Sequence, residues 1–259
     1  MVSSTPQVVE VIERGNQGAI AVVDFAEFTS RGTLAELIRR DLPDHTVLRI
    51  DAVTAVGTDL TDLHIDELAA RCADELAPGR PALVIGYCSA AALALRIAAV
   101  LAASGRAPAV ALVEPTWLTP DHVRGELAQV RALLHAEGDY DGPLDIESLR
   151  AVLLADATRE LRSQGLSEDE VEECAELLLP RYEAWFGFLL MTLRDAGGSV
   201  GLAYGGPVEV LLGRDSVPSV ETSGATSFTV HRLPVGAADL LQSEYTGVAI
   251  QAALAGSRA

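Results

Sequence analysis

The chain has 259 residues, of which 49% are hydrophobic, 22% charged and 5% aromatic, as in a globular protein with one large domain or two small ones. All 19 basic residues are arginines, and 37 acidic residues bring the formal charge to −18. This charge disfavours partners that present phosphates or anionic lipid. The lack of lysine excludes a P-loop lysine, a Schiff-base lysine and Ser-Lys catalysis.

Cysteine and histidine spacing argues against a metal site or a disulfide framework. Cys72, Cys88 and Cys174 form no CxxC pair, and the five histidines form no HxH or HxxxH pair. The N-terminal segment does not have the pattern of a secretory signal, and the longest apolar run, residues 90–103, is too short to span a bilayer. We therefore expect a cytoplasmic protein with no metal, no bound cofactor, no nucleic-acid partner and no membrane partner.

Up to residue 114 the sequence alternates between strand and helix patterns. Short apolar runs predict buried strands, and longer segments with helical spacing predict helices, the first with Thr33 as its N-cap. This alternation predicts a mostly parallel sheet with crossover helices. The expected strands are residues 18–25, 46–50, 81–86 and 108–114, and the expected helices are residues 32–42, 65–76 and 89–103.

Residues 117–195 break this alternation with a helical pattern, interrupted by turn residues at 138–143, 165–167 and 180. We interpret the segment as a helical lid inserted into a single domain that spans residues 1–259. Residues 137–176 contain thirteen acids and three arginines, which indicates a solvated helical face. Strands are expected again at 207–212 and 227–233, followed by a final helix at 238–254.

The most informative segment is residues 81–92, PALVIGYCSAAA. An apolar strand runs through Gly86 and Cys88 directly into a helix of small residues, which is the context of a G-x-S-x-G nucleophile elbow with cysteine as the nucleophile. Gly86 and Ala90 hold the small positions that let strand and helix approach closely, and a helix N-terminus favours the thiolate. The alternative is that Cys88 is a small core residue in an ordinary turn.

With this elbow, and with the order of elements from residue 18 to 254, the chain resembles the thioesterase family of the α/β hydrolases. These enzymes act on acyl chains carried by polyketide and nonribosomal peptide synthases. The resemblance implies an α/β-hydrolase fold, with a mostly parallel sheet, helices on both faces and a helical lid. Cysteine at the elbow resembles the aminoacyltransferase branch, which implies an acyl or aminoacyl substrate on the phosphopantetheine of an acyl or peptidyl carrier protein.

The resemblance implies a catalytic acid in one of two places. Residues 109–115, AVALVEP, put Glu114 at the end of the strand that follows the elbow helix, and VEVLLGRDS puts Asp215 after the first strand beyond the lid. Either carboxylate would lie at the carboxyl edge of the parallel sheet, where such folds keep their sites. Either could instead be an ordinary turn acid.

The histidine of the family is missing from its usual position. The family carries it after the last strand as Gly-x-His, where this chain has Gly236, Ala237 and Ala238. His231 lies seven residues earlier in an expected strand, as a displaced base or as an ordinary strand side chain. A thiol needs a general base less than a hydroxyl does, so acylation of Cys88 could survive while hydrolysis by water becomes slow.

The resemblance also implies an oxyanion hole. Its donors would be the backbone N–H of Ser89 and an N–H of Phe25 or Ala26, in the loop after the first expected strand. Aromatic residues in or beside the lid either line an acyl channel or pack helices together, and these are Trp117, Tyr182, Trp185, Phe186 and Phe188.

Two classes of function remain open. The first is an enzyme that transfers or cyclises an acyl group through a Cys88 acyl-enzyme, or, if a base lies elsewhere, an ordinary editing or chain-releasing thioesterase. The second is an α/β-hydrolase-fold protein that binds, cyclises or epimerises a natural-product intermediate without a covalent step. The missing histidine is the main support for the second class.

Overall fold

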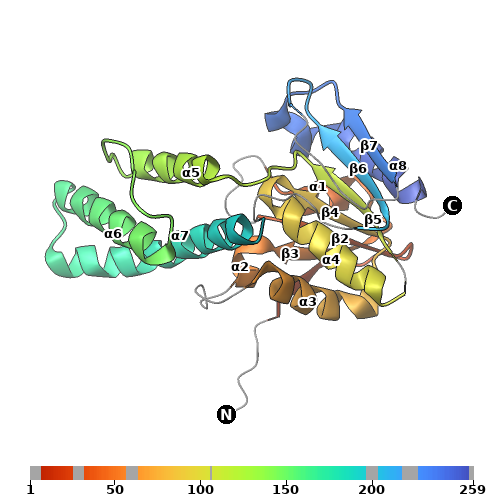
Figure 1. Ribbon diagram of the computed structural model, residues 1–259, viewed down its shortest axis with the longest axis horizontal. Helices are drawn as coiled ribbons and strands as arrows, with labels where there is room; N and C mark the ends of the chain where they lie inside the picture. The colour runs from red at the N-terminus through yellow and green to blue at the C-terminus, as the bar shows by residue number, and fades with distance from the viewer. Residues whose placement is uncertain are drawn as a thin grey trace, which may run out of the picture. The chain divides into compact units, whose positions relative to one another are not determined.

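The computed structural model describes residues 7–25, 32–56, 64–105, 107–196, 204–217 and 227–256. The described residues form two compact units, which Figure 1 shows as ribbons. The α/β unit comprises the residues before 56, residues 64–117 and the residues after 195. The helical insertion comprises residues 118–195 and Val56.

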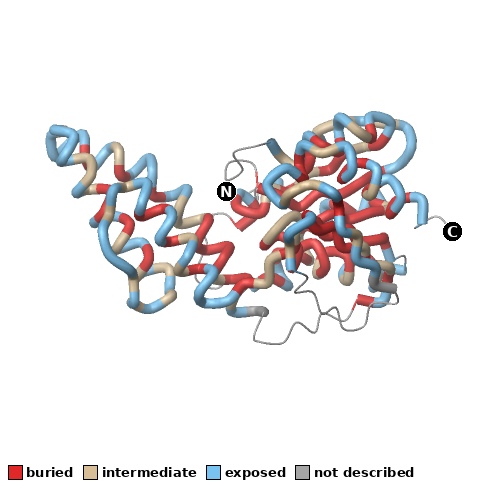
Figure 2. Tube along the Cα trace, turned by 90° about the horizontal axis from the view of Figure 1, so that it is seen from above, coloured by how far each residue is buried: buried red, intermediate tan, exposed pale blue. Residues whose placement is uncertain are grey.

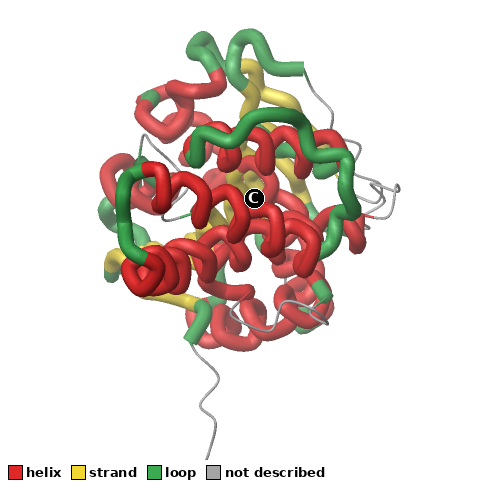
Figure 3. Tube along the Cα trace, turned by 90° about the vertical axis from the view of Figure 1, so that its left-hand side faces the viewer, coloured by secondary structure: helices red, strands yellow, loops and turns green. Residues whose placement is uncertain are grey.

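The α/β unit contains a sheet that, within the described residues, has seven strands in the order β1-β3-β2-β4-β5-β6-β7. β1 is antiparallel to β3, and the other neighbours are parallel, which confirms the predicted mostly parallel sheet. The strands, yellow in Figure 3, are β1 (Val9–Glu13), β2 (Ala19–Asp24), β3 (Thr46–Asp51), β4 (Leu83–Tyr87), β5 (Ala109–Val113), β6 (Pro207–Leu212) and β7 (Ser227–Arg232).

The burial of the strands explains why apolar runs in the sequence predicted them. Every residue of β2 and β5 is buried, as expected for strands covered by helices on both faces. These strands are among the buried segments drawn red in Figure 2. β1 was not predicted from the sequence, because an edge strand with exposed positions and a register shift after Val11 lacks a continuous apolar run.

Helices cover both faces of the sheet. Side chains of α1 and α8 share one core cluster with the sheet, whereas α3 and α4 pack on each other, with α4 against β4 and β5. The unit's α-helices are α1 (Leu34–Asp41), α2 (Ala52–Val56, whose last residue groups with the insertion), α3 (Ile65–Leu76), α4 (Ala91–Ala103) and α8 (Glu244–Gly256). Its 3-10 turns are η1 (Ala77–Gly79), η2 (Cys88–Ala90) and η3 (Ala237–Gln242).

Two helix ends show how the sequence determines local structure. Thr33 is the N-cap of α1 as predicted: its hydroxyl accepts from Glu36 N at 3.2 Å, and the Glu36 carboxylate accepts from Thr33 N at 2.8 Å. The single helix expected at 238–254 is divided, because Ser243 is extended and separates η3 from α8.

The helical insertion consists, in its described residues, of helices and loops. They are α5 (Pro120–Leu133), α6 (Ile146–Ser163) and α7 (Glu168–Ala196). Pro180, expected in a turn, instead lies inside α7. Burial of Val171, Ala175 and Leu179 on one face of α7 stabilises the helix on the N-terminal side of this proline.

Ion pairs join the helices of the insertion. Asp156 on α6 is buried and accepts from Arg131 Nε on α5 at 2.7 Å, and Arg131 Nη1 also donates to the Gly138 carbonyl at 2.9 Å. Acidic residues at 168–170, 172, 173 and 176 are exposed, as the prediction of a solvated helical face requires. The buried pair connects α5 to α6, while most of the acidic charge faces solvent.

Candidate active site

Cys88 stands at a sharp turn between β4 and η2. Its φ is 52°, in the left-handed region that L-residues other than glycine rarely adopt. Holding a side chain there costs about 1–2 kcal/mol, so the surrounding structure must impose it. A strained strand-to-helix turn with the nucleophile at its centre is the geometry of a nucleophile elbow.

Gly86 explains how helix and strand approach so closely at this turn. A Cβ at position 86 would lie 2.7 Å from the Cβ of Ala94 and 2.8 Å from the Cα of Ala91. Both distances are shorter than real Cβ contacts, so only glycine fits without a shift of α4. The small residues of the predicted elbow therefore have a packing role here.

Thr116 connects the elbow to the segment after β5. The Cys88 Sγ lies 3.5 Å from Thr116 Oγ1, and the Cys88 carbonyl accepts from Thr116 N at 3.1 Å. Cys88 itself is partly buried. Thr116 was not predicted from the sequence, because its position beside the thiol depends on a contact between residues 28 positions apart.

Glu114 is fixed in place at the end of β5. Its φ is 47°, Oε1 accepts from Gly213 N at 3.0 Å, and Oε2 accepts from the Ser216 hydroxyl at 2.8 Å. Tyr87 and Val113 are paired in the sheet, so Cys88 and Glu114 follow neighbouring strand ends, about 5 Å apart. The structure therefore brings these two predicted residues to one site.

Asp215, the other candidate acid, lies at the surface. Its side chain is 77% exposed, and its nearest charged partner is Arg214 at 3.5 Å. Ser216, the next residue, donates to Glu114 instead. The loop after β6 thus contributes a hydroxyl and a backbone N–H to the site, neither of which the sequence analysis had identified.

The structure does not bring His231 to Cys88. His231 lies on the edge strand β7 and pairs with Leu211 of β6, which is in one row with Val113 of β5 and Tyr87 of β4. About three strand spacings, roughly 14 Å, therefore separate His231 from Tyr87. Its Nε2 lies 2.7 Å from Glu209 Oε2. These contacts are those of an edge-strand side chain.

Ala238 occupies an exposed position in η3, and the start of η3 packs beside Gly213. A Cβ on Gly213 would lie 2.6 Å from Ala237 N. Gly213 N donates to Glu114, so Ala237, the residue before Ala238, lies against the residue that holds this carboxylate. All five histidines fall in the described residues, and none of them is hydrogen-bonded to Glu114.

Two of the three residues predicted for the oxyanion hole can be placed. Ser89 is buried in η2, directly after Cys88, and Phe25 is buried directly after β2, which pairs with β4 through Val23 and Gly86. Their backbones therefore lie on neighbouring strand ends. Ala26 lies outside the described residues.

Asp24, the residue before Phe25, links β2 to α1 and β3. It is fully buried, its Oδ2 accepts from Ala35 N at 3.0 Å, and its Oδ1 accepts from Arg49 Nε at 2.8 Å. Burial raises the pKa of this carboxyl, and the charge of Arg49 opposes the increase. Asp24 connects the ends of β2 and α1 beside the expected oxyanion donor.

Tyr87 places a phenol near both groups of the site. Its pKa is raised to about 12, first by burial and then by the charges of Cys88 and Glu114. At neutral pH the phenol is therefore protonated, so it can donate a hydrogen bond but cannot serve as a general base.

The other two cysteines have different surroundings. Cys72 is fully buried in α3, and burial raises its pKa to about 12. Cys174 is partly buried on α7 in the helical insertion. Within the described residues, no group of three His, Cys, Asp or Glu side chains is arranged to hold a metal ion.

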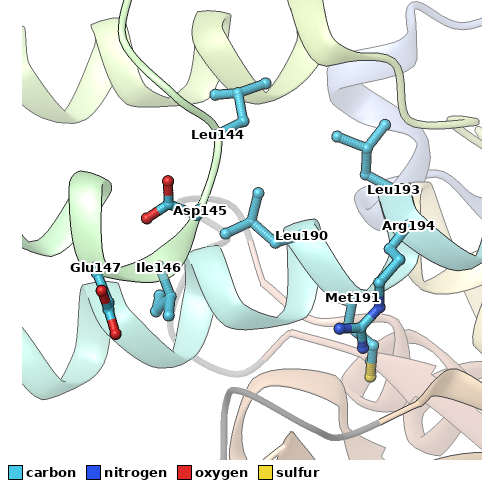
Figure 4. A pocket seen from close by; sticks show the side chains of 8 residues that line it. All are labelled: Leu144, Asp145, Ile146, Glu147, Leu190, Met191, Leu193 and Arg194. Atoms are coloured by element: carbon cyan, nitrogen blue, oxygen red, sulfur yellow. The ribbon is translucent and has the colours of Figure 1, made fainter.

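The helical insertion contains a pocket of about 520 Å³ between the start of α6 and the end of α7. Figure 4 shows Leu144 before α6, and Leu190 and Leu193 on α7. Its walls combine apolar side chains with Asp145, Glu147 and Arg194, and are completed by Ile146 and Met191.

The aromatic residues predicted beside this region mainly pack helices. Trp185, Phe186 and Phe188 are buried, and the rings of Trp185 and Phe188 stack with centroids 6.4 Å apart. None of the three lines the pocket between α6 and α7. Tyr182 and Trp117 are partly buried. That any of these aromatic residues lines an acyl channel stays a prediction.

Solved structures with a similar fold include a thioesterase domain and a nonribosomal peptide synthetase. The NocB thioesterase domain from the nocardicin cluster aligns with a TM-score of 0.58 and 17% identity, over 96% of this chain and 99% of that one. The four-domain nonribosomal peptide synthetase AB3403, bound to AMP and glycine, aligns with a TM-score of 0.54 and 14% identity, over 95% of this chain and 20% of that one.

An esterase also has a similar fold. The thermophilic esterase from Thermogutta terrifontis aligns with a TM-score of 0.54 and 15% identity, over 97% of this chain and 94% of that one. At these identities the likeness shows the fold, which is that of the α/β hydrolases, as predicted. No protein-family model and no curated protein sequence matches the chain.

No helix in the described ranges is long and apolar enough to cross a membrane.

Proposed function

We propose that this protein is a thioesterase-like acyl-transfer enzyme that carries an acyl or aminoacyl group on Cys88. The observation that carries the proposal is the elbow, where Cys88 has a φ of 52° and Gly86 allows the close approach of α4. A fold that maintains backbone strain at a thiol, at the carboxyl edge of its sheet, has the arrangement expected of a nucleophile.

The proposed chemistry balances without an oxidant or a reductant. The Cys88 thiolate attacks the thioester carbonyl carbon, the C–S bond to the carrier's pantetheine breaks, and the pantetheine thiol leaves with the proton that Cys88 lost. An acceptor thiol or amine then attacks the acyl-enzyme and releases Cys88. The N–H groups of Ser89 and Phe25 are the proposed oxyanion donors for both tetrahedral intermediates.

Transfer or cyclisation is favoured over hydrolysis because no imidazole accompanies Cys88 and Glu114. Deprotonation of water by a positioned base contributes about 10²–10⁴-fold to such a step. A thioester on Cys88 is also close in energy to the carrier thioester, so a transfer between thiols is readily reversible.

The proposed partner is an acyl or peptidyl carrier protein, whose phosphopantetheine brings the substrate, and no further cofactor is required. The likeness of fold to the NocB thioesterase domain and to part of a nonribosomal peptide synthetase supports this context. The NocB thioesterase domain has also been solved as a covalent complex with a fluorophosphonate nocardicin G analogue. We propose that the reaction takes place in the cytoplasm.

Intact-protein mass spectrometry after incubation with an acyl N-acetylcysteamine thioester tests this proposal. We expect an adduct of one acyl group that disappears in Cys88→Ala and persists in Cys72→Ala and Cys174→Ala. An adduct that survives in Cys88→Ala would contradict the assignment of the nucleophile.

The second candidate is a protein of the same fold that binds, cyclises or epimerises an intermediate without a covalent step. The observation in its favour is the alanine at position 238 in η3, where the resembled family has its base. Absence of any adduct in the wild-type protein, together with saturable binding of the thioester, would support this candidate instead.

A further inference from the structure

Thr116 contacts Cys88 through both its backbone and its side chain. Thr116 N donates to the Cys88 carbonyl at 3.1 Å, and Thr116 Oγ1 lies 3.5 Å from Cys88 Sγ. Both residues are partly buried. The backbone hydrogen bond joins Thr116 to the elbow itself, so the hydroxyl is held beside the sulfur that forms the proposed acyl-enzyme.

The segment that contains Thr116 is fixed at its other end by Glu114. The Glu114 carboxylate accepts from Gly213 N at 3.0 Å and from the Ser216 hydroxyl at 2.8 Å. Pro115, the residue between Glu114 and Thr116, is buried, and its ring fixes its own φ. Thr116 therefore follows two constrained residues and is itself bonded to Cys88, which keeps its hydroxyl close to Sγ.

The hydroxyl of Thr116 retains a hydrogen atom to donate. A threonine hydroxyl has one O–H donor and two acceptor lone pairs. Among the residues that the structure describes, its one hydrogen-bond partner is Cys88 Sγ, in a contact where the thiol donates and Oγ1 accepts. The O–H is therefore available to a second acceptor that lies close to Sγ.

A bound thioester supplies such an acceptor. In the tetrahedral intermediate, Cys88 Sγ and the sulfur of the leaving pantetheine are bonded to the same carbon, so one hydroxyl can contact both sulfurs. Two other side chains do not serve as the base. Tyr87, with its pKa raised to about 12, is protonated at neutral pH, and His231 lies away from Cys88 on the edge strand β7.

We propose that Thr116 is a catalytic residue whose hydroxyl passes the proton of Cys88 to the leaving sulfur. This inference rests on the proposed acyl transfer at Cys88. As the bond between Sγ and the thioester carbon forms, the Sγ proton moves to Thr116 Oγ1. The former Oγ1 proton moves to the pantetheine sulfur as the bond between that sulfur and the carbon breaks. An acceptor thiol removes the acyl group from Cys88 by the same steps in reverse.

A hydroxyl relay favours exchange between thiols over hydrolysis. The hydroxyl is a weak base, so it transfers a proton most easily between two groups of similar acidity. Two thiols each have an ordinary pKa of about 8.5, whereas that of bulk water is about 15.7. The relay therefore explains how transfer can proceed without an imidazole while attack by water stays slow.

Two thioesters that differ in their leaving thiol test the relay. Butyryl N-acetylcysteamine thioester releases an alkyl thiol, whose sulfur needs the relayed proton. S-phenyl thiobutyrate releases a more acidic aryl thiol, which leaves readily without that proton. Acylation of Cys88 by each thioester is followed by intact-protein mass spectrometry and peptide mapping. Thr116→Val replaces the hydroxyl with a methyl group of similar size, and Thr116→Ser keeps the hydroxyl.

We expect Thr116→Val to slow acylation by the N-acetylcysteamine thioester by about 10², as loss of a proton-transfer group does. Acylation by the phenyl thioester should fall only a few-fold, and Thr116→Ser should keep both rates within a few-fold of the wild type. Thr229→Val, the same replacement at an exposed position of β7, is the matched control and should leave both rates unchanged. Thr116→Ala tests the same loss if valine disturbs the turn.

The outcomes separate the two proposals. An equal fall with both thioesters in Thr116→Val and Thr116→Ala, or no fall with either, overturns the relay but leaves acyl transfer at Cys88 in place. A loss in Thr116→Ser as large as that in Thr116→Val also overturns the relay, because the hydroxyl is then not the group that acts. Acylation of wild-type Cys88 by neither thioester overturns the proposed function, and the relay with it.

Discussion

In the α/β unit, two strand ends hold residues with side chains in the left-handed region, Cys88 and Glu114, and both belong to the candidate site. In the helical insertion, the one such residue among those described is His135, in an exposed turn after α5. The insertion instead depends on a buried ion pair between Arg131 and Asp156. Strain at these two strand ends thus coincides with the proposed chemistry, although Arg80 in the same unit is strained away from the site, and the insertion's buried charge joins its helices.

Strained backbone is a better indicator of a functional site in such a chain than a buried ion pair. Strained backbone survives only where the surrounding packing imposes it, and selection for a reactive geometry is one reason to retain it. A buried ion pair, in contrast, is costly to break but is weak evidence for a reaction.

The largest difference we expect is between the alkylation rates of the three cysteines. Raising the pKa of Cys72 to about 12 lowers its thiolate fraction at neutral pH by about 10³ relative to an ordinary thiol. Pulse alkylation with iodoacetamide at pH 7.5, followed by peptide mapping, should therefore label Cys88 first and Cys72 only after unfolding. Labelling of Cys174 on the acidic insertion before Cys88 would contradict a nucleophilic elbow.

A histidine placed at position 238 should accelerate loss of the acyl group. Ala238→His puts an imidazole next to Ala237, which lies against the residue that donates to Glu114, and a positioned general base would shorten the lifetime of the acyl-enzyme by up to about 10². Decay of the mass adduct without an acceptor thiol measures this effect. His231→Ala is the matched control and should leave the lifetime unchanged. If wild-type hydrolysis is rapid and collapses in His231→Ala, the base is His231 and the protein is an ordinary thioesterase.

Removal of the buried carboxylate in the insertion should lower stability most. Asp156→Ala leaves Arg131 buried without its charged partner, which costs about 3–5 kcal/mol. Glu183→Ala breaks the pair with the exposed Arg150 and should cost about 0–1 kcal/mol. Urea unfolding followed by circular dichroism compares the two variants, and equal losses would show that the burial of Asp156 has no energetic consequence.

Much of the fold was readable from the sequence because central parallel strands are continuous apolar runs. β2, β5 and α3 lie within two residues of the segments predicted for them. β1 and the break at Ser243 were missed, since an exposed edge strand and one extended residue leave little trace in apolar periodicity.

The candidate site was readable only where a motif fixes local geometry. The elbow around Cys88 is such a motif, whereas Glu114 was expected, beside Asp215, only from the resemblance to a family. Gly213, Ser216 and Thr116 were not found, because their contacts depend on how loops from separate strands meet above the sheet. Sequence spacing carries no information on such long-range contacts.

A methyl group added to a glycine should lower the stability at the elbow and raise it in the helical insertion. Gly86→Ala pushes Ala91 and Ala94 of α4 away from β4, and overpacking of this kind costs about 1–3 kcal/mol. Gly125→Ala, on an exposed and open position of α5, should instead stabilise the protein by up to about 1 kcal/mol. Urea unfolding measures both changes. A neutral Gly86→Ala with unchanged labelling of Cys88 would contradict a tightly packed elbow.

The smallest expected effect isolates the backbone strain itself. Cys88→Ala and Cys88→Gly both remove the thiol, but only glycine adopts a φ of 52° without the penalty imposed by a Cβ atom. Cys88→Gly should therefore be more stable than Cys88→Ala by about 1 kcal/mol, after the greater chain entropy of unfolded glycine is included. Arg80, at a φ of 45° after η1 and away from the candidate site, provides the matched pair Arg80→Ala and Arg80→Gly. Because Arg80 has a comparable dihedral angle, its pair should show a difference of the same sign. An advantage of glycine at Arg80 but not at Cys88 would mean that the elbow relaxes in solution, and the argument from strain to a nucleophile would fail.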